Sequence, residues 1–170
     1  MNQDTQTRPG TAGDSARRVL GPEMEIRPEW IDFNGHLNMA YYSVLFDEGC
    51  SPDFQALGFD EAYRTDPGYT TMVADFRIRY LRELHLGDRV RCSFQIVRVG
   101  AKAFHFCQEL FHSDGWVAAT SETVSLHVDM KARKVVPYTA ARRKALDDMA
   151  AQHAQWPVPD WVGLPLGVRS

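Results

Sequence analysis

The chain has 170 residues, of which 44% are hydrophobic and 24% are charged. This composition is typical of one globular domain and argues against a disordered or fibrous chain. The formal net charge is −3, which excludes the broad positive surface that binding to nucleic acid or to an anionic membrane would require. We therefore expect neither nucleic acid nor membrane among its partners.

The first residues and the cysteines indicate the compartment. Met1–Gly21 is polar and lacks an apolar core of signal-peptide length, so it is predicted to be a disordered leader. Cys50, Cys92 and Cys107 show no metal-binding spacing, and we expect them to be reduced and buried as small hydrophobic residues. Together these features predict a cytoplasmic protein.

A short strand and a turn open the predicted fold. Met24 and Ile26 alternate with charged residues, which predicts a strand over Met24–Pro28. The compact polar segment Asp32–Asn38 follows, and its Asn and Gly residues mark a turn because both tolerate positive φ. This turn separates the strand from a long helical pattern.

A helix is predicted from Met39 to about Leu57, because apolar residues recur there close to a 3.6-residue period. Asn38 precedes it and is the expected N-cap, since its side chain can accept a hydrogen bond from a first-turn amide. Pro52 interrupts the pattern and predicts a kink or two shorter helices. The helix should be buried on one face.

From Tyr69 onward, apolar and polar residues alternate with a period of two, which is the pattern of strands. Short polar turns such as Gly87-Asp88 separate the runs and favour an antiparallel meander. The predicted strands are Ala74–Tyr80, Val90–Ile96, Lys102–His112 and Trp116–Met130, with a short continuation at Lys134–Val136.

The C-terminal region is predicted to be a helix over Thr139–His153, with Leu146 and Met149 facing the protein, and an extended tail over Trp156–Ser170. The element order is thus strand, long helix and a run of antiparallel strands, an α+β arrangement in which the helix is the natural cover for one face of the sheet. We predict the hotdog fold over residues 22–155, in which a curved antiparallel sheet wraps a long central helix. Exposed edge strands predict a homodimer or a dimer of dimers.

The segment Asp32–Asn38 is the strongest candidate for chemistry, because ionisable and turn residues are concentrated there just ahead of the helix. A helix N-terminus presents free N–H groups and the positive end of the helix dipole, which would stabilise an oxyanion. Asp32 is close enough in sequence to reach the same carbonyl carbon as a base or nucleophile. The alternative is that Asp32 and Asn38 only cap the turn and that His36 only packs.

The sequence around this segment resembles the hotdog-fold acyl-CoA thioesterases, in particular their 4-hydroxybenzoyl-CoA thioesterase-like branch. The resemblance covers roughly Glu23 to Tyr138, and its most specific part is the DxxGHxN pattern of Asp32–Asn38. It implies the hotdog fold and the hydrolysis of an acyl-CoA thioester, with coenzyme A entering as part of the substrate and with no resident cofactor or metal. The matching runs are Trp30–Tyr42, Phe46–Glu48, Phe76–Asp88 and Ala118–Asp129.

The resemblance also implies roles for individual residues. It places the family's catalytic carboxylate on Asp32, as nucleophile or general base, and the oxyanion-binding amide near Asn38 or Met39. Another hotdog branch takes its catalytic carboxylate from the helix, which makes Glu48 the reserve candidate. The candidate catalytic residues are therefore Asp32, His36, Asn38 and Glu48, and the candidate oxyanion and substrate-binding residues are Gly35, Met39, Trp30, Tyr41 and Tyr42. For the aromatic residues among them, plain core packing is the alternative.

The phosphates of coenzyme A require cations near the mouth of a pocket. The candidates are Arg77, Arg79 and Arg82, with ordinary solvent-facing strand residues as the alternative interpretation. The acyl group stays open. The aromatic residues suit an aryl or medium-chain acyl group, and an aromatic cage could also hold a cationic one such as betainyl.

Two other functions compete with the thioesterase interpretation. A hotdog hydratase or dehydratase acting on enoyl-CoA also pairs an Asp with a nearby His, but resembles a longer spacing with Pro before the His, whereas Gly35 precedes His36 here. A non-catalytic module that binds acyl-CoA is the second. Such regulators usually add a DNA-binding segment, and Met1–Gly21 is too short and too polar for a helix-turn-helix.

Overall fold

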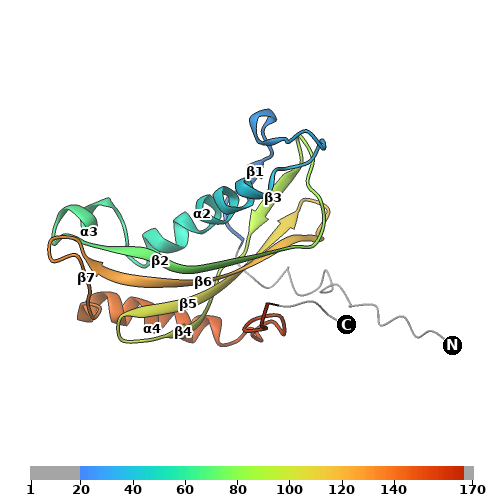
Figure 1. Cartoon of the computed structure of the whole chain (residues 1–170). Coiled ribbons are helices and arrows are strands. Elements are labelled where there is room, and N and C mark those ends of the chain that lie inside the picture. Colours follow the sequence, from blue (N-terminus) through green and yellow to red (C-terminus); the bar gives the residue numbers. More distant parts are fainter. Residues whose placement is uncertain (1–19, 167–170) are drawn as a thin grey trace. The chain divides into compact units, whose positions relative to one another are not determined.

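The computed structural model describes residues 20–166 (Figure 1), so residues 1–19 of the predicted leader and 167–170 of the predicted tail lie outside it. The helices and strands, in chain order, are β1 (Met24–Glu25), the 3-10 helix η1 (Pro28–Trp30), α2 (Met39–Ala56), α3 (Glu61–Thr65), β2 (Tyr69–Tyr80), β3 (Arg89–Cys92), β4 (Gln95–Val99), β5 (Ala103–His112), β6 (Val117–Asp129), β7 (Lys134–Val135) and α4 (Ala140–His153). None of these helices is long and apolar enough to span a bilayer.

The described residues form two compact units. Unit 1 contains the described part of Met1–Ala56 together with Arg77–Phe94 and Gln108–Ser121. Unit 2 contains Leu57–Phe76, Gln95–Cys107 and the described part of Glu122–Ser170. The candidate residues of the turn and of the long helix all belong to unit 1.

The sheet has the strand order β1-β3-β5-β6-β2, with β4 also pairing with β5 and β7 with β6. The pairs β1–β3, β3–β5, β4–β5 and β6–β7 are antiparallel. The predicted meander is therefore correct for β3, β5 and β6 and wrong for β2, which lies beside β6 rather than beside β3. Leu81–Asp88 joins β2 to β3, and a connector of this length does not force its two strands to pair as a tight hairpin does.

In unit 1, α2 packs against β3 (Figure 1). The buried residues of α2 recur three and four positions apart, which places them on one face of the helix. They are Tyr42, Leu45, Phe46, Gly49 and Cys50. Gly49 allows the closest approach, because a Cβ atom at this position would lie 2.6 Å from both Cβ and Sγ of Cys92. The predicted long helix with one buried face is confirmed.

The predicted division of this helix at Pro52 is wrong, because α2 runs as one helix through the proline. Packing holds the helix on both sides of it. Cys50 is buried before the proline, and the ring of Phe54 contacts that of Phe94 after it, with 6.0 Å between centroids. These contacts offset the hydrogen bond that proline cannot donate.

The predicted single strand Val90–Ile96 is also wrong, because β3 and β4 are separate strands. Exposed and buried residues alternate up to Cys92, and all four following residues, including Ser93 and Gln95, are buried. The side chain of Gln95 donates to the carbonyl of Trp156 at 3.2 Å, and α4 packs on β4. Polar and apolar residues from Ser93 to Ile96 are therefore buried alike, so burial no longer follows the period of two that the sequence keeps.

The short helix α3 in unit 2 was not predicted. Its N-cap is Asp60, whose carboxylate accepts a hydrogen bond from the backbone N–H of Tyr63 at 2.9 Å. The Tyr63 hydroxyl lies 2.9 Å from Nε2 of His127, which is fully buried. Nδ1 of the same imidazole lies 3.1 Å from the carbonyl oxygen of Val136. One neutral tautomer satisfies both bonds, with Nδ1–H donating to Val136 and Nε2 accepting from Tyr63.

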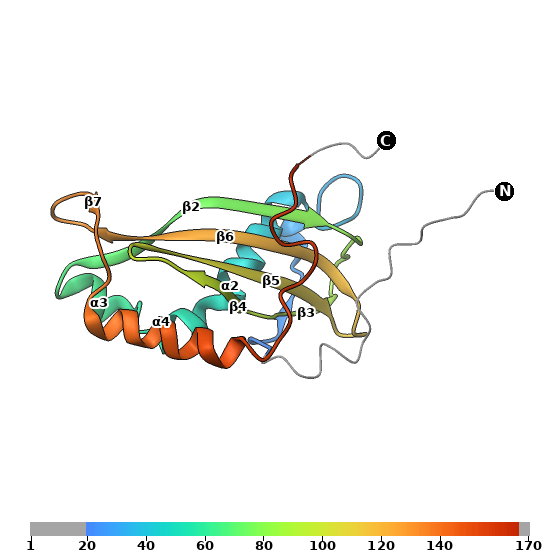
Figure 2. The ribbon, with the colours of Figure 1, turned by 90° about the horizontal axis from the view of Figure 1, so that it is seen from below.

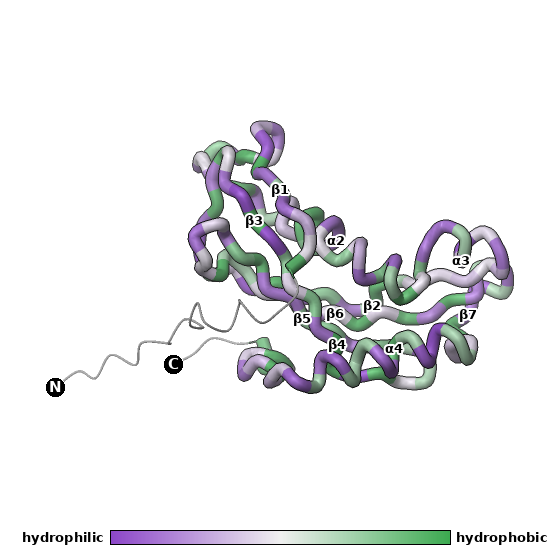
Figure 3. The backbone as a smooth tube through the Cα atoms, turned by 180° about the vertical axis from the view of Figure 1, so that it is seen from behind, coloured by the Kyte–Doolittle hydropathy of each residue, from purple (hydrophilic) through white to green (hydrophobic). Residues whose placement is uncertain are grey.

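The predicted C-terminal helix is confirmed as α4, which lies alongside β4 (Figure 2). Thr139 is its N-cap and accepts a hydrogen bond from the N–H of Arg142 at 3.4 Å. Hydrophilic and hydrophobic residues alternate along α4 (Figure 3). Leu146 is fully buried and Met149 is half-buried, so both predicted contact residues face the protein.

Both ends of the described chain contact the folded part. Leu20 forms an isolated bridge with Ser93, and the N–H of Gly21 donates to the carbonyl of Cys92 at 2.8 Å. The last two residues of the predicted leader, Leu20 and Gly21, thus contact the folded part. In the tail, the N–H of Gly163 donates to the Glu122 carboxylate at 2.9 Å.

The contact between α4 and β4 is expected to weaken in mild acid. Nδ1 of His153 accepts a hydrogen bond from the N–H of Ile96 at 3.0 Å, and burial lowers the pKa of this imidazole below its ordinary value of 6.5. Because the unfolded chain then binds more protons, stability is complete above about pH 6.5 and is lost as the pH falls from there through the lowered pKa.

His153→Gln keeps a side-chain oxygen that can accept the Ile96 N–H but removes the titration. The melting temperature of the variant should therefore fall less than that of the wild type between about pH 7.5 and about pH 5.5. Equal falls in the two proteins would show that His153 does not control the loss.

Candidate active site

The predicted catalytic segment is a closed loop between η1 and α2. Ile31 and Leu37 form an antiparallel bridge that closes it. Inside the loop, the N–H of Asp32 donates to the carbonyl of His36, and the N–H of Gly35 donates to the carbonyl of Asp32, both at 3.0 Å. Gly35 has a φ of +84°, which glycine adopts without strain. The turn therefore needs glycine at the position where the sequence has it.

The Asp32 side chain is fixed within this loop. Its Oδ1 accepts a hydrogen bond from the N–H of Asn34 at 2.8 Å, which makes an Asx-turn. The residue is half-buried rather than exposed. A carboxylate of fixed direction at a partly open position suits attack on a bound carbonyl or on a water molecule.

The helix α2 begins directly after the loop. Oδ1 of Asn38 accepts a hydrogen bond from the N–H of Ala40 at 3.0 Å, so Asn38 is the N-cap, as predicted. The N–H of Asn38 donates to the carbonyl of Trp30 at 2.9 Å, which ties the start of the helix to η1. Met39 is the first helical residue, and its side chain is exposed. The loop thus joins a carboxylate to a helix N-terminus, where the dipole favours negative charge.

The candidate aromatic residues divide into core and surface. Trp30 is buried and stacks on the half-buried Tyr41, with ring centroids 5.5 Å apart, while the Arg27 guanidinium lies 4.8 Å from the Trp30 centroid. Tyr42 is buried and meets the exposed Tyr80 edge-on at 5.0 Å. Trp30 and Tyr42 are thus buried, whereas Tyr41 and Tyr80 are more accessible.

The Tyr42 hydroxyl is a neutral group. Burial raises the pKa of Tyr42 to about 12, although a hydrogen bond with the backbone of Leu84 opposes the rise. A phenol of this pKa stays protonated across the physiological range. Tyr42 is therefore suited to hold the backbone at Leu84 and not to act as a base.

The loop also contacts the connector between β2 and β3. The N–H of Leu37 donates to the carbonyl of Leu84 at 2.7 Å, and Leu84 is fully buried. Nε2 of His36 lies 3.6 Å from the carboxylate of Glu83, and its ring meets that of His85 edge-on at 5.8 Å. Sequence reasoning gave Glu83 no role. The run of ionisable residues just ahead of the Gly87-Asp88 turn was the available signal.

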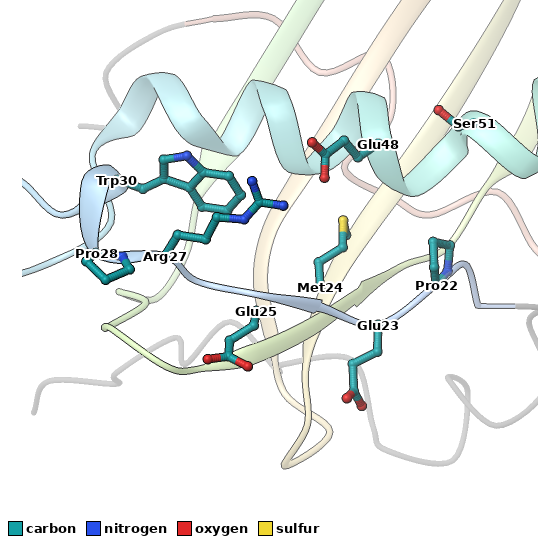
Figure 4. Close-up of a pocket in the computed structure, with 9 residues that line it drawn as sticks. All are labelled: Pro22, Glu23, Met24, Glu25, Arg27, Pro28, Trp30, Glu48 and Ser51. Atoms are coloured by element: carbon teal, nitrogen blue, oxygen red, sulfur yellow. The ribbon is translucent and has the colours of Figure 1, made fainter.

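Glu48, the reserve catalytic candidate, lies in different surroundings. It lines a pocket of about 600 Å³ between β1 and α2, and Figure 4 shows the Arg27 guanidinium between Glu48 and Trp30. The residues that line the pocket are Pro22, Glu23, Met24, Glu25, Arg27, Pro28, Trp30, Glu48 and Ser51. Asp32 is not among them. The two carboxylates that the sequence offered as alternatives therefore do not share this pocket.

The three candidate cations for coenzyme A lie on the C-terminal half of β2 and just beyond it. Arg77 and Arg79 are half-buried and stand two positions apart on β2, so they lie on the same face of that strand. Arg82 follows the strand, and its guanidinium lies 4.3 Å from the ring centroid of Trp116. A phosphate-binding role for these arginines stays a prediction.

The three cysteines are buried free thiols, as predicted. Burial raises the pKa of Cys50 to about 12 and that of Cys92 well above its ordinary value. A thiol of such a pKa is not a thiolate near neutral pH. Cys50 and Cys92 are therefore unsuited to nucleophilic catalysis.

A family model described as the thioesterase-like superfamily matches residues 26–161. The chain belongs to this superfamily. The match includes the Asp32 loop, the whole of α2 and the three arginines, and it confirms the family that the sequence resembles.

Two curated relatives of this chain are named for the hydrolysis of betainyl-CoA. One is the L-carnitine dehydrogenase/betainyl-CoA thioesterase of Rhizobium meliloti, which is 32% identical over 162 residues, covering 95% of this chain and 32% of the relative. This chain therefore spans about a third of that bifunctional protein. The other is the betainyl-CoA thioesterase of Pseudomonas aeruginosa, which is 28% identical over 147 residues, covering 86% of this chain and 92% of the relative.

Solved structures confirm the hotdog fold of this superfamily member. A hypothetical protein from Staphylococcus aureus, solved in complex with CoA, has a TM-score of 0.83 at 21% identity and covers 89% of this chain and 97% of its own. A DHNA-CoA thioesterase from the same organism has a TM-score of 0.72 at 18% identity, and the match covers 81% of this chain and 95% of the thioesterase. At these identities the likeness shows the fold alone.

Proposed function

We propose that the chain hydrolyses an acyl-CoA thioester to the free acid and CoA. The observation that carries this proposal is the Asp32 carboxylate, fixed by the N–H of Asn34 and joined through one closed loop to the N-terminus of α2. The names of the curated relatives support thioester hydrolysis. The CoA complex of a protein with the same fold supports a coenzyme A ester as the substrate.

Asp32 would act in one of two ways. As a nucleophile, its carboxylate oxygen attacks the thioester carbon, the C–S bond breaks, CoA leaves as the thiolate, and water hydrolyses the resulting anhydride. As a general base, it takes a proton from the water that attacks the same carbon. In both cases negative charge develops on the thioester oxygen, and the N–H of Met39 at the positive end of the α2 dipole would stabilise it. A burst of free CoA ahead of the free acid in rapid mixing would assign the nucleophilic route.

A cationic acyl group is the first substrate to test. Several curated relatives are named for betainyl-CoA, whose acyl group carries a quaternary ammonium. Such a cation binds to the faces of aromatic rings, and Tyr41 and Tyr80 are the accessible rings near the loop. An aryl or medium-chain acyl group is the alternative that these aromatic residues also suit.

The proposal is tested by measuring thiol release from betainyl, short-chain, medium-chain and aryl CoA esters, with crotonyl-CoA hydration followed in parallel. We expect thiol release from at least one ester, fastest for betainyl-CoA, and no hydration of crotonyl-CoA. Hydration without thiol release would favour the hydratase alternative. Binding of CoA esters with neither reaction would favour the non-catalytic module.

Assembly and compartment belong to the same proposal. β2 ends the strand order of the sheet, and its residues Met72 and Val73 are exposed, so a second copy could pair with it to give a homodimer, with a dimer of dimers as the larger assembly. For the substrate, Arg77, Arg79 and Arg82 would contact the phosphates of coenzyme A. The proposed hydrolysis requires no resident cofactor or metal. Buried free thiols suit the reducing cytoplasm, which is the proposed compartment.

A further inference from the structure

We propose that Glu83 is a positioning residue for this reaction, because its carboxylate orients His36 and, through His36, the loop that carries Asp32. The inference depends on the proposed function and adds a residue from a distant part of the chain to that site. Glu83 belongs to the connector between β2 and β3, and its side chain is 66% exposed. A side chain this exposed contributes little to the packing of the hydrophobic core.

His36 links Glu83 to Asp32 through two different groups. Its imidazole Nε2 lies 3.6 Å from Oε2 of Glu83. Its backbone carbonyl accepts the hydrogen bond from the N–H of Asp32 at 3.0 Å. A displacement of the His36 ring therefore reaches the backbone of Asp32 through a single residue. The carboxylate of Asp32 is in turn fixed to the N–H of Asn34, so the whole loop moves with this pair.

Hydrogen bonds to neighbouring segments hold the connector that carries Glu83 in place. The carboxylate of Asp88 accepts a hydrogen bond from the N–H of His85 at 2.8 Å, and its other oxygen lies 3.5 Å from Nε2 of His112 on β5. The N–H of Gly87 donates to the carbonyl of Ile26 at 3.0 Å, and the N–H of Ile26 donates to the carbonyl of Asp88 at 2.9 Å. Contacts from two other parts of unit 1 thus hold the connector, which suits a residue that must orient another.

The charged and titratable groups around Glu83 come from three elements. His36 faces it from the loop, and the Tyr42 hydroxyl on α2 is close enough that the Glu83 charge contributes to its raised pKa. His85 and Asp88 follow on the connector itself, with His85 Nδ1 3.9 Å from Asp88. His36 is the one of these groups that is both paired with Glu83 and bonded to Asp32.

The test compares Glu83→Gln, His36→Gln and the double variant, with Glu29→Gln as a matched control that removes an exposed carboxylate from η1. On the ester that the wild type cleaves best, Glu83→Gln should lower kcat about tenfold with KM within about twofold, the size of effect expected for a contacting pair. The double variant should be no slower than His36→Gln alone. Glu29→Gln should match the wild type.

One readout does not require activity. The amides of Asp32 and Gly35 should exchange hydrogen several-fold faster in Glu83→Gln than in the wild type, at an unchanged melting temperature. Unchanged exchange would overturn the positioning role, as would additive losses in the double variant. If no ester is cleaved, the proposed function fails, and the exchange rates of these amides still decide the role of Glu83.

Discussion

Replacing Asp32 with Asn is expected to lower kcat for thioester hydrolysis by roughly 10²–10⁴-fold, the usual contribution of a general base, and by more if Asp32 is the nucleophile. Asn keeps the Oδ1 atom that accepts the N–H of Asn34 at 2.8 Å, so the loop should keep its shape. The amide nitrogen can neither attack a thioester carbon nor take a proton from water. Thiol-release kinetics and the melting temperature of the same preparation check both parts of this prediction.

A control variant shows whether the loss of one negative charge, rather than of the catalytic group, lowers the activity. Glu29→Gln removes one exposed carboxylate from the neighbouring η1 helix and should leave kcat and KM unchanged, because long-range effects of exposed charges are screened by salt. An Asp32→Asn variant as active as the wild type would contradict the assignment. Glu48→Gln, which changes the carboxylate in the pocket between β1 and α2, would then be tested next.

Local features of the site could be read from the sequence, because neighbours in the chain determine them. Asn38 was predicted to cap α2, and its side chain does accept a first-turn amide. Gly35 was predicted to lie in a turn, and it has the positive φ that a turn of this kind needs. The resemblance of the same few residues to one family then gave the fold and the superfamily, both of which the comparisons confirm.

Features that depend on distant parts of the chain could not be read in this way. The contact of His36 with Glu83 requires the connector between β2 and β3 to lie beside the Asp32–Asn38 loop. The spacing of apolar residues in the sequence does not predict that two such distant segments lie together. The position of β2 beside β6, rather than β3, depends in the same way on the path of Leu81–Asp88. The break between β3 and β4 is hidden in the same way, because polar and apolar residues keep alternating through Ser93–Ile96 although all four are buried.

A different variant tests the packing that holds α2, and with it the loop, on the sheet. Gly49→Val is expected to lower the free energy of unfolding by about 3 kcal/mol, at the upper end of the usual cost of overpacking. The first added carbon would lie 2.6 Å from both Cβ and Sγ of Cys92, so the helix must move away from β3 or the strand must bend. Because a domain is stable by only about 5–15 kcal/mol, denaturant unfolding should show a large shift in midpoint and a lower folded yield.

The matched control is Ala56→Val, which adds the same kind of side chain at an exposed position of the same helix and should change stability by less than about 1 kcal/mol. A double-mutant cycle identifies the clash itself. Cys92→Gly removes the two atoms that a side chain at position 49 would meet, so it should cost less in the Gly49→Ala background than in the wild type. Additive costs would mean that α2 and β3 can separate at this point without a penalty. In that case the close approach of Gly49 to Cys92 would not be what fixes the helix, and its other buried residues together with the loop bonds from Leu37 and Asn38 would hold it.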